Sequence, residues 1–163
     1  MGKTLLRLPR WVGVALTLAW MGLIFRLSSL SKPVPVDVRV PLFFNDFAHA
    51  PLFGMVAFLA LIALPRRMEP FPWPRLDRRA WWGVLALVAL YGISDEIHQS
   101  TTPGRDASLG DVITDVVGGF SVLMLARHLG RGPGGRAGTW WRLAAGLALC
   151  ATAAAASTWL FVD

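Results

Sequence analysis

Residues 80–99 read AWWGVLALVALYGISDEIHQ, an apolar block that ends in acids, a histidine and a glutamine. An α-helix needs roughly 20 residues to cross the hydrocarbon core of a bilayer, and this block is close to the minimum length. Ionisable side chains at the end of such a block are costly to bury and commonly mark function. The stretch therefore predicts a membrane-spanning helix from Ala80 to Ile97 that carries polar groups at one end.

Four more blocks of the same kind occur along the 163 residues, of which 55% are apolar and 16% charged. Proline- and glycine-rich connectors separate the blocks. We therefore predict an all-α membrane protein, a bundle of about five transmembrane helices in a single domain spanning residues 1–163. The other predicted helices are Trp11 to Leu27, Phe47 to Leu64, Gly110 to Ala126 and Leu143 to Val162. The first is expected to be a retained helix, because no convincing cleavage site follows it.

The basic residues indicate the orientation of the bundle. Most of the 16 Lys and Arg residues lie before the first block, between the second and third, or between the fourth and fifth. Lys and Arg are retained on the cytoplasmic side of short loops. We therefore predict a multi-pass protein of the cytoplasmic (inner) membrane with its N-terminus inside and its C-terminus outside. The net charge of +6 then reflects topology, so the expected partner is the lipid bilayer and nucleic acid is excluded.

Three of the predicted helices bring polar residues to their outer ends. Asp46 and His49 are three residues apart and share a helix face, as do Asp111 and Asp115. Ser108 before Asp111 resembles a capping box. On the third helix Glu96 is expected to point to the side of an arc formed by its polar neighbours. The candidate ligand-binding residues are Asp46, His49, Tyr91, Asp95, Glu96, His98, Gln99, Arg105, Ser108, Asp111 and Asp115.

Asp115 lies a full turn inside its predicted helix, as Asp95 does in the preceding one. A buried charge needs a partner, and Arg105, Arg26 or a histidine is expected to supply it. The single cysteine, Cys150, lies in an apolar block and has no second thiol with which to form a disulfide or a zinc site.

Four motifs between Phe25 and Gly119 resemble those of a known family. They are FRLSS (25–29), NDFAH (45–49), YGISDEIHQ (91–99) and PGRDASLGD (103–111). Together they resemble the VanZ-like family of small bacterial membrane proteins, named for a protein associated with resistance to teicoplanin-type glycopeptide antibiotics. The helix predicted at 143–162 is an extra C-terminal one. Phe47 stands where the family usually has lysine and Asp115 where it usually has asparagine, which makes this site more negative than the usual one.

The resemblance implies a role at the cell envelope and an effect on glycopeptide susceptibility, but no particular reaction. The residues allow three functions. The first is binding of a polar headgroup or cell-wall precursor, with Arg105 and Arg26 holding phosphate. The second is an intramembrane enzyme on a lipid-linked substrate, with Asp95 or Glu96 as base and a histidine, His49 or His98, as acid. The third is a structural or interaction scaffold, in which the polar residues only join helices.

A metal ion could in principle be held by carboxylates and imidazole from this set, namely Asp46, His49, Asp95 and Glu96. The spacing contains no recognised metal signature such as His-Glu-x-x-His, so no metal site is predicted. The sequence identifies no cofactor.

Overall fold

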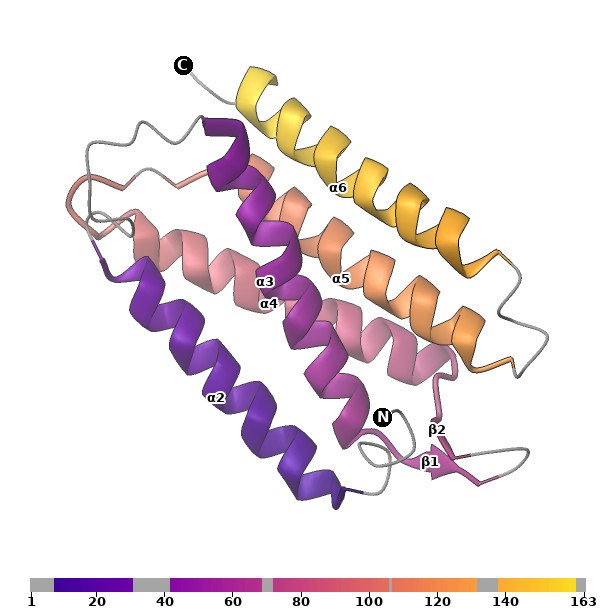
Figure 1. The fold of residues 1–163 in the computed structure, drawn as a ribbon. Helices are drawn as coiled ribbons and strands as arrows, with labels where there is room; N and C mark the ends of the chain where they lie inside the picture. Colours follow the sequence, from indigo (N-terminus) through magenta and orange to yellow (C-terminus); the bar gives the residue numbers. More distant parts are fainter. Residues whose placement is uncertain (1–7, 31–41, 69–71, 106, 132–137, 161–163) are drawn as a thin grey trace.

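The computed structural model describes residues 8–30, 42–68, 72–105, 107–131 and 138–160. In these ranges five helices are long and apolar enough to cross a membrane, which confirms the predicted helical membrane protein (Figure 1). Asp106 of the fourth motif lies outside the described residues. The helices are α2 (Arg10–Ser28), α3 (Leu42–Ala63), α4 (Arg78–Gln99), α5 (Leu109–Leu129) and α6 (Thr139–Leu160).

Helices α2, α4 and α5 extend past the predicted spans at both ends, because flanking residues, most of them polar, continue the helical backbone hydrogen bonding beyond the apolar block. The largest difference is in α3, which begins at Leu42 instead of Phe47. Asp46 and His49 therefore lie inside the helix, and His49 is roughly two turns from its start. Pro51 follows within the same helix and, lacking an N–H, cannot bond the carbonyl of Phe47.

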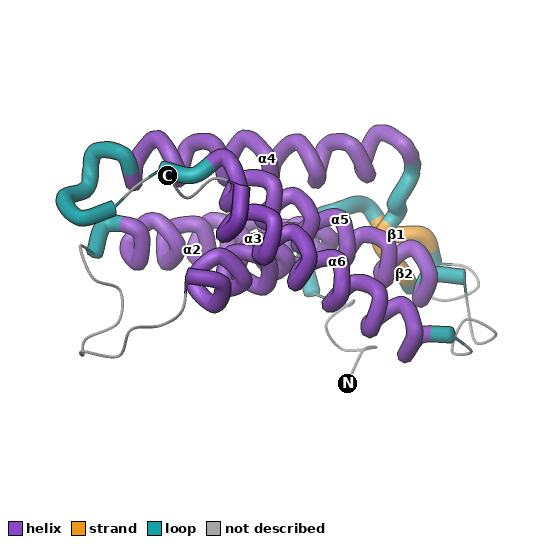
Figure 2. Tube along the Cα trace, turned by 90° about the horizontal axis from the view of Figure 1, so that it is seen from above, coloured by secondary structure: helices purple, strands orange, loops and turns teal. Residues whose placement is uncertain are grey.

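The helices alternate in direction, and α3 and α5 pack against each other at the centre. Helix α4 runs along one side of this pair and α6 along the other, while α2 packs against α3 (Figure 2). We call the end where α3 and α5 begin and α2, α4 and α6 finish the polar end. The opposite end is called the basic end. It carries the described arginines Arg10, Arg66, Arg67, Arg75, Arg78, Arg79, Arg127, Arg131 and Arg142.

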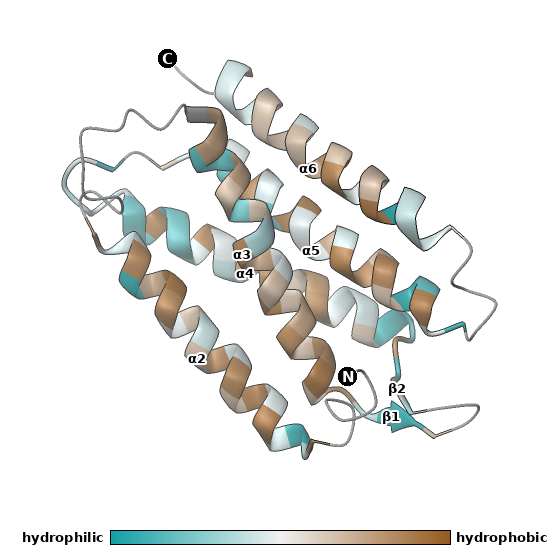
Figure 3. Ribbon diagram, viewed as in Figure 1, coloured by the Kyte–Doolittle hydropathy of each residue, from teal (hydrophilic) through white to brown (hydrophobic). Residues whose placement is uncertain are grey.

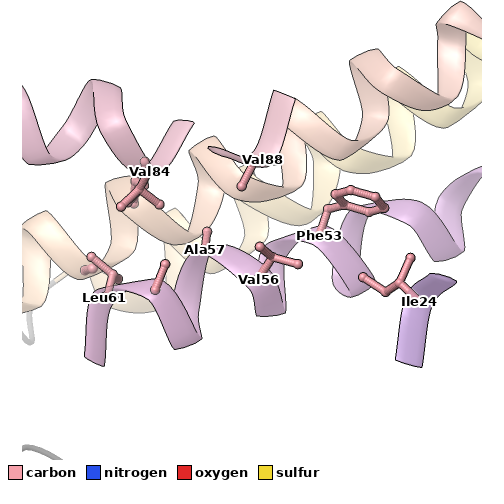
Figure 4. Packing of buried hydrophobic residues seen from close by; sticks show 10 residues of the cluster. Ile24, Phe53, Val56, Ala57, Leu61, Val84 and Val88 are labelled. Atoms are coloured by element: carbon pink, nitrogen blue, oxygen red, sulfur yellow. The ribbon is translucent and has the colours of Figure 1, made fainter. Parts of the chain in front are cut away.

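The apolar core lies between α2, α3, α4 and α5 (Figure 4). Phe53, Val56, Val88 and Leu123 are completely buried there. Many large apolar side chains instead face outward, as Leu90 does, and long stretches of the helices are coloured as hydrophobic in Figure 3. Helices that are apolar all round are typical of a chain whose solvent is lipid.

Close helix contact depends on glycine at the crossing of α3 and α5. A Cβ atom added to Gly118 would overlap the backbone of Ala50. Small residues let membrane helices approach until their backbones touch, which maximises packing where there is no hydrophobic driving force between them. The same crossing brings the first turns of α5 against the polar part of α3.

Two of the connections contain regular structure in the described residues. At the basic end β1 (Arg66–Arg67) pairs antiparallel with β2 (Trp73–Pro74), a small ribbon that the sequence analysis did not predict. At the polar end Gly104 adopts a φ of 78° in the turn between α4 and α5. Glycine adopts positive φ without steric cost, so the turn can bring Arg105 and Ser108 back against α4.

Candidate functional site at the polar end

Polar residues from three helices meet at the polar end, where α3 and α5 begin and α4 finishes. Figure 3 shows hydrophilic segments on these helices in this region. Each of the residues is almost fully buried, from 0% exposed for Asp115 to 8% for His49. We call this set the acidic cluster: Asp46, His49, Asp95, Glu96, Gln99, Asp111 and Asp115.

His49 connects the two acids of α5. Its Nδ1 atom lies 3.1 Å from Oδ1 of Asp115, and its Nε2 atom lies 3.6 Å from Oδ2 of Asp111. The buried Asp115 therefore has a histidine as its partner, one of the partners expected from the sequence, and neither Arg105 nor Arg26. Its other oxygen faces α4 at Gly92, where an added Cβ would lie only 2.7 Å from Oδ2.

Asp95 and Glu96 accept hydrogen bonds from several elements. Ser28 of α2 donates its hydroxyl to Asp95 at 2.6 Å, and Gln99 donates its amide to the other Asp95 oxygen at 2.9 Å. The backbone N–H of Ser108 donates to Glu96 at 2.7 Å. Glu96 was predicted to point to the side of the polar arc, and the start of α5 packs against α4 there and encloses its carboxylate.

The guanidinium of Arg105 caps the C-terminal end of α2. It donates to the carbonyls of Leu27 at 3.1 Å and Leu30 at 3.2 Å, and to the Gln99 side-chain oxygen at 3.2 Å. Carbonyls at a helix C-terminus lack intrahelical partners and carry partial negative charge, so an arginine there stabilises the helix end. Three of its donors are therefore already used within the protein. Arg26, the other predicted phosphate ligand, is exposed.

Three of the candidate residues make contacts outside the acidic cluster. The Tyr91 hydroxyl donates to the carbonyl of Met21, and the His98 ring bonds Ser29 at 2.9 Å and stacks on Phe25. Ser108 is the N-cap of α5 and accepts from the N–H of Gly110, as the sequence predicted. The capping box is not completed, because the carboxylate of Asp111 faces His49 instead.

Two residues that the sequence pattern did not single out also contact the acidic cluster. Ser28 belongs to the FRLSS motif, so its motif membership was a usable signal. Thr158 of α6 donates to Asp46 at 2.8 Å, and no sequence pattern marked it. All five helices therefore contribute to the polar end.

The acidic cluster contains more acceptors than donors. Five carboxylates meet one histidine and one glutamine. Among the residues that the structure describes, Oδ2 of Asp115 is buried with no hydrogen-bond partner. Oδ1 of Asp111 is buried with no hydrogen bond of ordinary geometry, although the Ser157 side chain interacts with the Asp111 carboxylate. A buried polar atom without a partner costs free energy, so these oxygens favour a ligand that brings donors or positive charge.

One part of the cluster also has the composition of a metal site. A ring nitrogen of His49 and one carboxylate oxygen each from Asp95 and Glu96 lie within 4.8 Å of one another. The two acids are adjacent on α4 and the histidine comes from α3, so the set has no signature in the linear sequence.

Comparison with known proteins gives a match at the level of the family. A family model described as VanZ/LLP1 matches residues 11–130, which include α5, most of α2 and the whole acidic cluster. Helix α6 lies beyond the matched residues. No curated protein and no solved structure matches the chain.

Proposed function

We propose that this multi-pass membrane protein, which belongs to the VanZ/LLP1 family, acts at the cell envelope by binding the polar part of a lipid headgroup or cell-wall precursor. The observation that carries the proposal is the excess of buried acceptors in the acidic cluster. Carboxylates bind hydroxyl, amide and ammonium groups through charge-assisted hydrogen bonds. Headgroups and cell-wall precursors offer such donors.

The proposal places the polar end on the outer face of the cytoplasmic membrane. Its support is the separation of charge along the bundle. The described arginines of the basic end, such as Arg66, Arg78 and Arg127, would remain in the cytoplasm. A headgroup of the outer leaflet, or a precursor exported to it, would then lie on the same side of the membrane as the acidic cluster.

An effect on glycopeptide susceptibility would follow from this binding. A precursor or headgroup held at the polar end is less accessible to an antibiotic that recognises the same surface. The support for this step is family membership, since the VanZ-like family is named for a protein associated with resistance to teicoplanin-type antibiotics.

The role of Arg105 in the proposal differs from the phosphate clamp expected from the sequence. Its guanidinium already donates to two carbonyls and to Gln99. We therefore assign Arg105 a positioning role, holding Gln99 beside Asp95 and Glu96, and assign recognition to the carboxylates.

The test is native mass spectrometry of the detergent-purified protein, which identifies retained lipids and precursors by mass. We compare wild type with Asp111→Asn, since Oδ1 of Asp111 is buried without a hydrogen bond of ordinary geometry to the described residues. Asp77→Asn is the matched control, because Asp77 is an exposed carboxylate that caps α4 at the basic end. We expect headgroup or precursor adducts on wild type and Asp77→Asn and their loss in Asp111→Asn.

Folded wild-type protein that retains no such adduct would contradict the proposal and favour the scaffold. Equal retention by the three proteins would move the binding site away from the acidic cluster.

A further inference from the structure

We infer that the acidic cluster is a binding site for one divalent transition-metal cation, with His49, Asp95 and Glu96 as its ligands. Their donor atoms lie within 4.8 Å of one another, and each of the three residues is at least nine-tenths buried. A cation about 2.1 Å from each donor holds neighbouring donors roughly 3.4 Å apart, so side-chain rotations and small helix movements would close the site.

The surroundings of His49 are those of a metal-ligating imidazole. Its Nδ1 atom faces the Asp115 carboxylate at 3.1 Å, so Nε2, which lies 3.6 Å from Oδ2 of Asp111, is the ring atom available to a cation. A histidine bound to a metal usually donates its other ring N–H to a carboxylate, which fixes the tautomer and the ring orientation. Asp115, completely buried, would perform this task and would not itself ligate.

Asp111 provides an independent observation. It is 5% exposed, its Oδ2 lies 3.6 Å from Nε2 of His49, and its Oδ1 makes no hydrogen bond of ordinary geometry with the described residues, although the Ser157 side chain interacts with this carboxylate. Its carboxylate is therefore held on the side of the imidazole where the cation would be. A bound cation would satisfy this carboxylate, either directly or through a water ligand.

The charge balance also favours a cation. Five buried carboxylates surround a single histidine. In the described part of the chain, the arginine that bonds a member of the cluster is Arg105, and it bonds the neutral Gln99. Uncompensated carboxylates in a membrane interior are costly, and a divalent cation removes two negative charges at once.

The donor set selects the kind of metal. Two carboxylate oxygens with one imidazole suit Zn²⁺ or Mn²⁺, whereas Mg²⁺ and Ca²⁺ prefer oxygen ligands alone. Three protein ligands leave a coordination position open, as in zinc sites that bind an exchangeable ligand. A phosphate oxygen of a bound headgroup could take this position. That last step rests on the proposed function, whereas metal binding itself does not.

The experiment measures metal binding by purified protein that has been stripped with a chelator. Zn²⁺ or Mn²⁺ is then added, stoichiometry is measured by elemental mass spectrometry, and the midpoint of thermal unfolding is followed in detergent. We expect one ion per chain, a higher midpoint with metal, and reversal by the chelator. His49→Gln and Glu96→Gln should weaken binding by at least about tenfold, while Asp77→Asn should bind as wild type does.

A second variant covers the case in which Glu96→Gln does not fold. Glu96→Asp keeps the charge but withdraws the carboxylate by one methylene, so it should fold and still bind metal more weakly. Wild-type protein that binds no metal, or binding that is equal in all variants, would overturn the inference. Lipid retention measured on the same metal-free samples tests the proposed function separately: retained lipid without metal leaves that proposal standing and removes only this one.

Discussion

Individual hydrogen bonds at the polar end hold acids from different helices in fixed positions. Ser28 illustrates this, because its hydroxyl joins the end of α2 to Asp95 across 67 residues of sequence. Both groups are buried, so water cannot replace the hydroxyl if it is removed. The free-energy cost of removing the Ser28 hydroxyl is then set by the buried carboxylate of Asp95, which loses a hydrogen-bond donor.

We expect Ser28→Ala to lower the free energy of unfolding by about 1–2 kcal/mol, which is high for a hydrogen bond between membrane helices because the acceptor is a carboxylate. The measurement is reversible unfolding in mixed micelles. Thr152→Ala is the control, since Thr152 is exposed and bonds the carbonyl of its own helix at Ala148. An equal decrease in the free energy of unfolding in both variants would mean that the hydrogen bond to Asp95 stabilises the protein no more than a bond within one helix does.

At the scale of the helices, the position of the acidic cluster depends on how closely α3 and α5 approach. Gly118 and Ala50 meet backbone to backbone at the crossing, less than one helical turn from Asp115 and His49 respectively. Any side chain at Gly118 would separate the helices there, and the distance between His49 and Asp115 would change with it.

We expect Gly118→Ala to destabilise the bundle by about 1–3 kcal/mol, because the neighbouring atoms are backbone and cannot rotate away. Gly83→Ala is a matched control with the opposite sign. Nothing lies within 4 Å of its added Cβ, so it should stabilise α4 by about 0.5–1 kcal/mol. Unfolding midpoints in the same detergent compare the two. A stable Gly118→Ala protein would contradict the close crossing.

The elements also show how far the sequence could predict the site. Alternating helix direction and short connectors predicted that four residues would gather at one end of the bundle: Asp46, His49, Asp95 and Asp111. That Glu96 is enclosed and His98 is not could not be predicted, because 100° periodicity describes one helix and the enclosing atoms belong to α5. Thr158 was missed for the same reason, since only packing brings α6 to Asp46.

For the whole molecule, the orientation in the membrane decides whether the acidic cluster can receive a ligand from outside. The charge distribution predicts that the polar end is outside, and the helices are long enough for either orientation. The cluster would face the periphery of the cell only in the predicted orientation.

We expect single cysteines at opposite ends to react differently with a membrane-impermeant maleimide in intact cells. Ser100→Cys lies in the exposed turn after α4 and should be labelled directly. Arg131→Cys, exposed after α5, should be labelled only after permeabilisation. Both are made in a Cys150→Ala background, which removes the single native cysteine. The reverse pattern of labelling would place the polar end in the cytoplasm and contradict the proposed function.

The linear chain was enough to predict a membrane protein, its helices and the end of the bundle at which the polar residues lie. This was possible because span length, apolar content and the order of charged loops are properties of the linear chain. Which atoms of those residues meet is known only from the tertiary structure. The pairing of His49 with Asp115, the enclosure of Glu96 and the metal-like set of three residues depend on helix rotation and on the Gly118 crossing. Helix rotation and the crossing at Gly118 are set by packing between segments far apart in the chain, and a local sequence pattern contains no information about that packing.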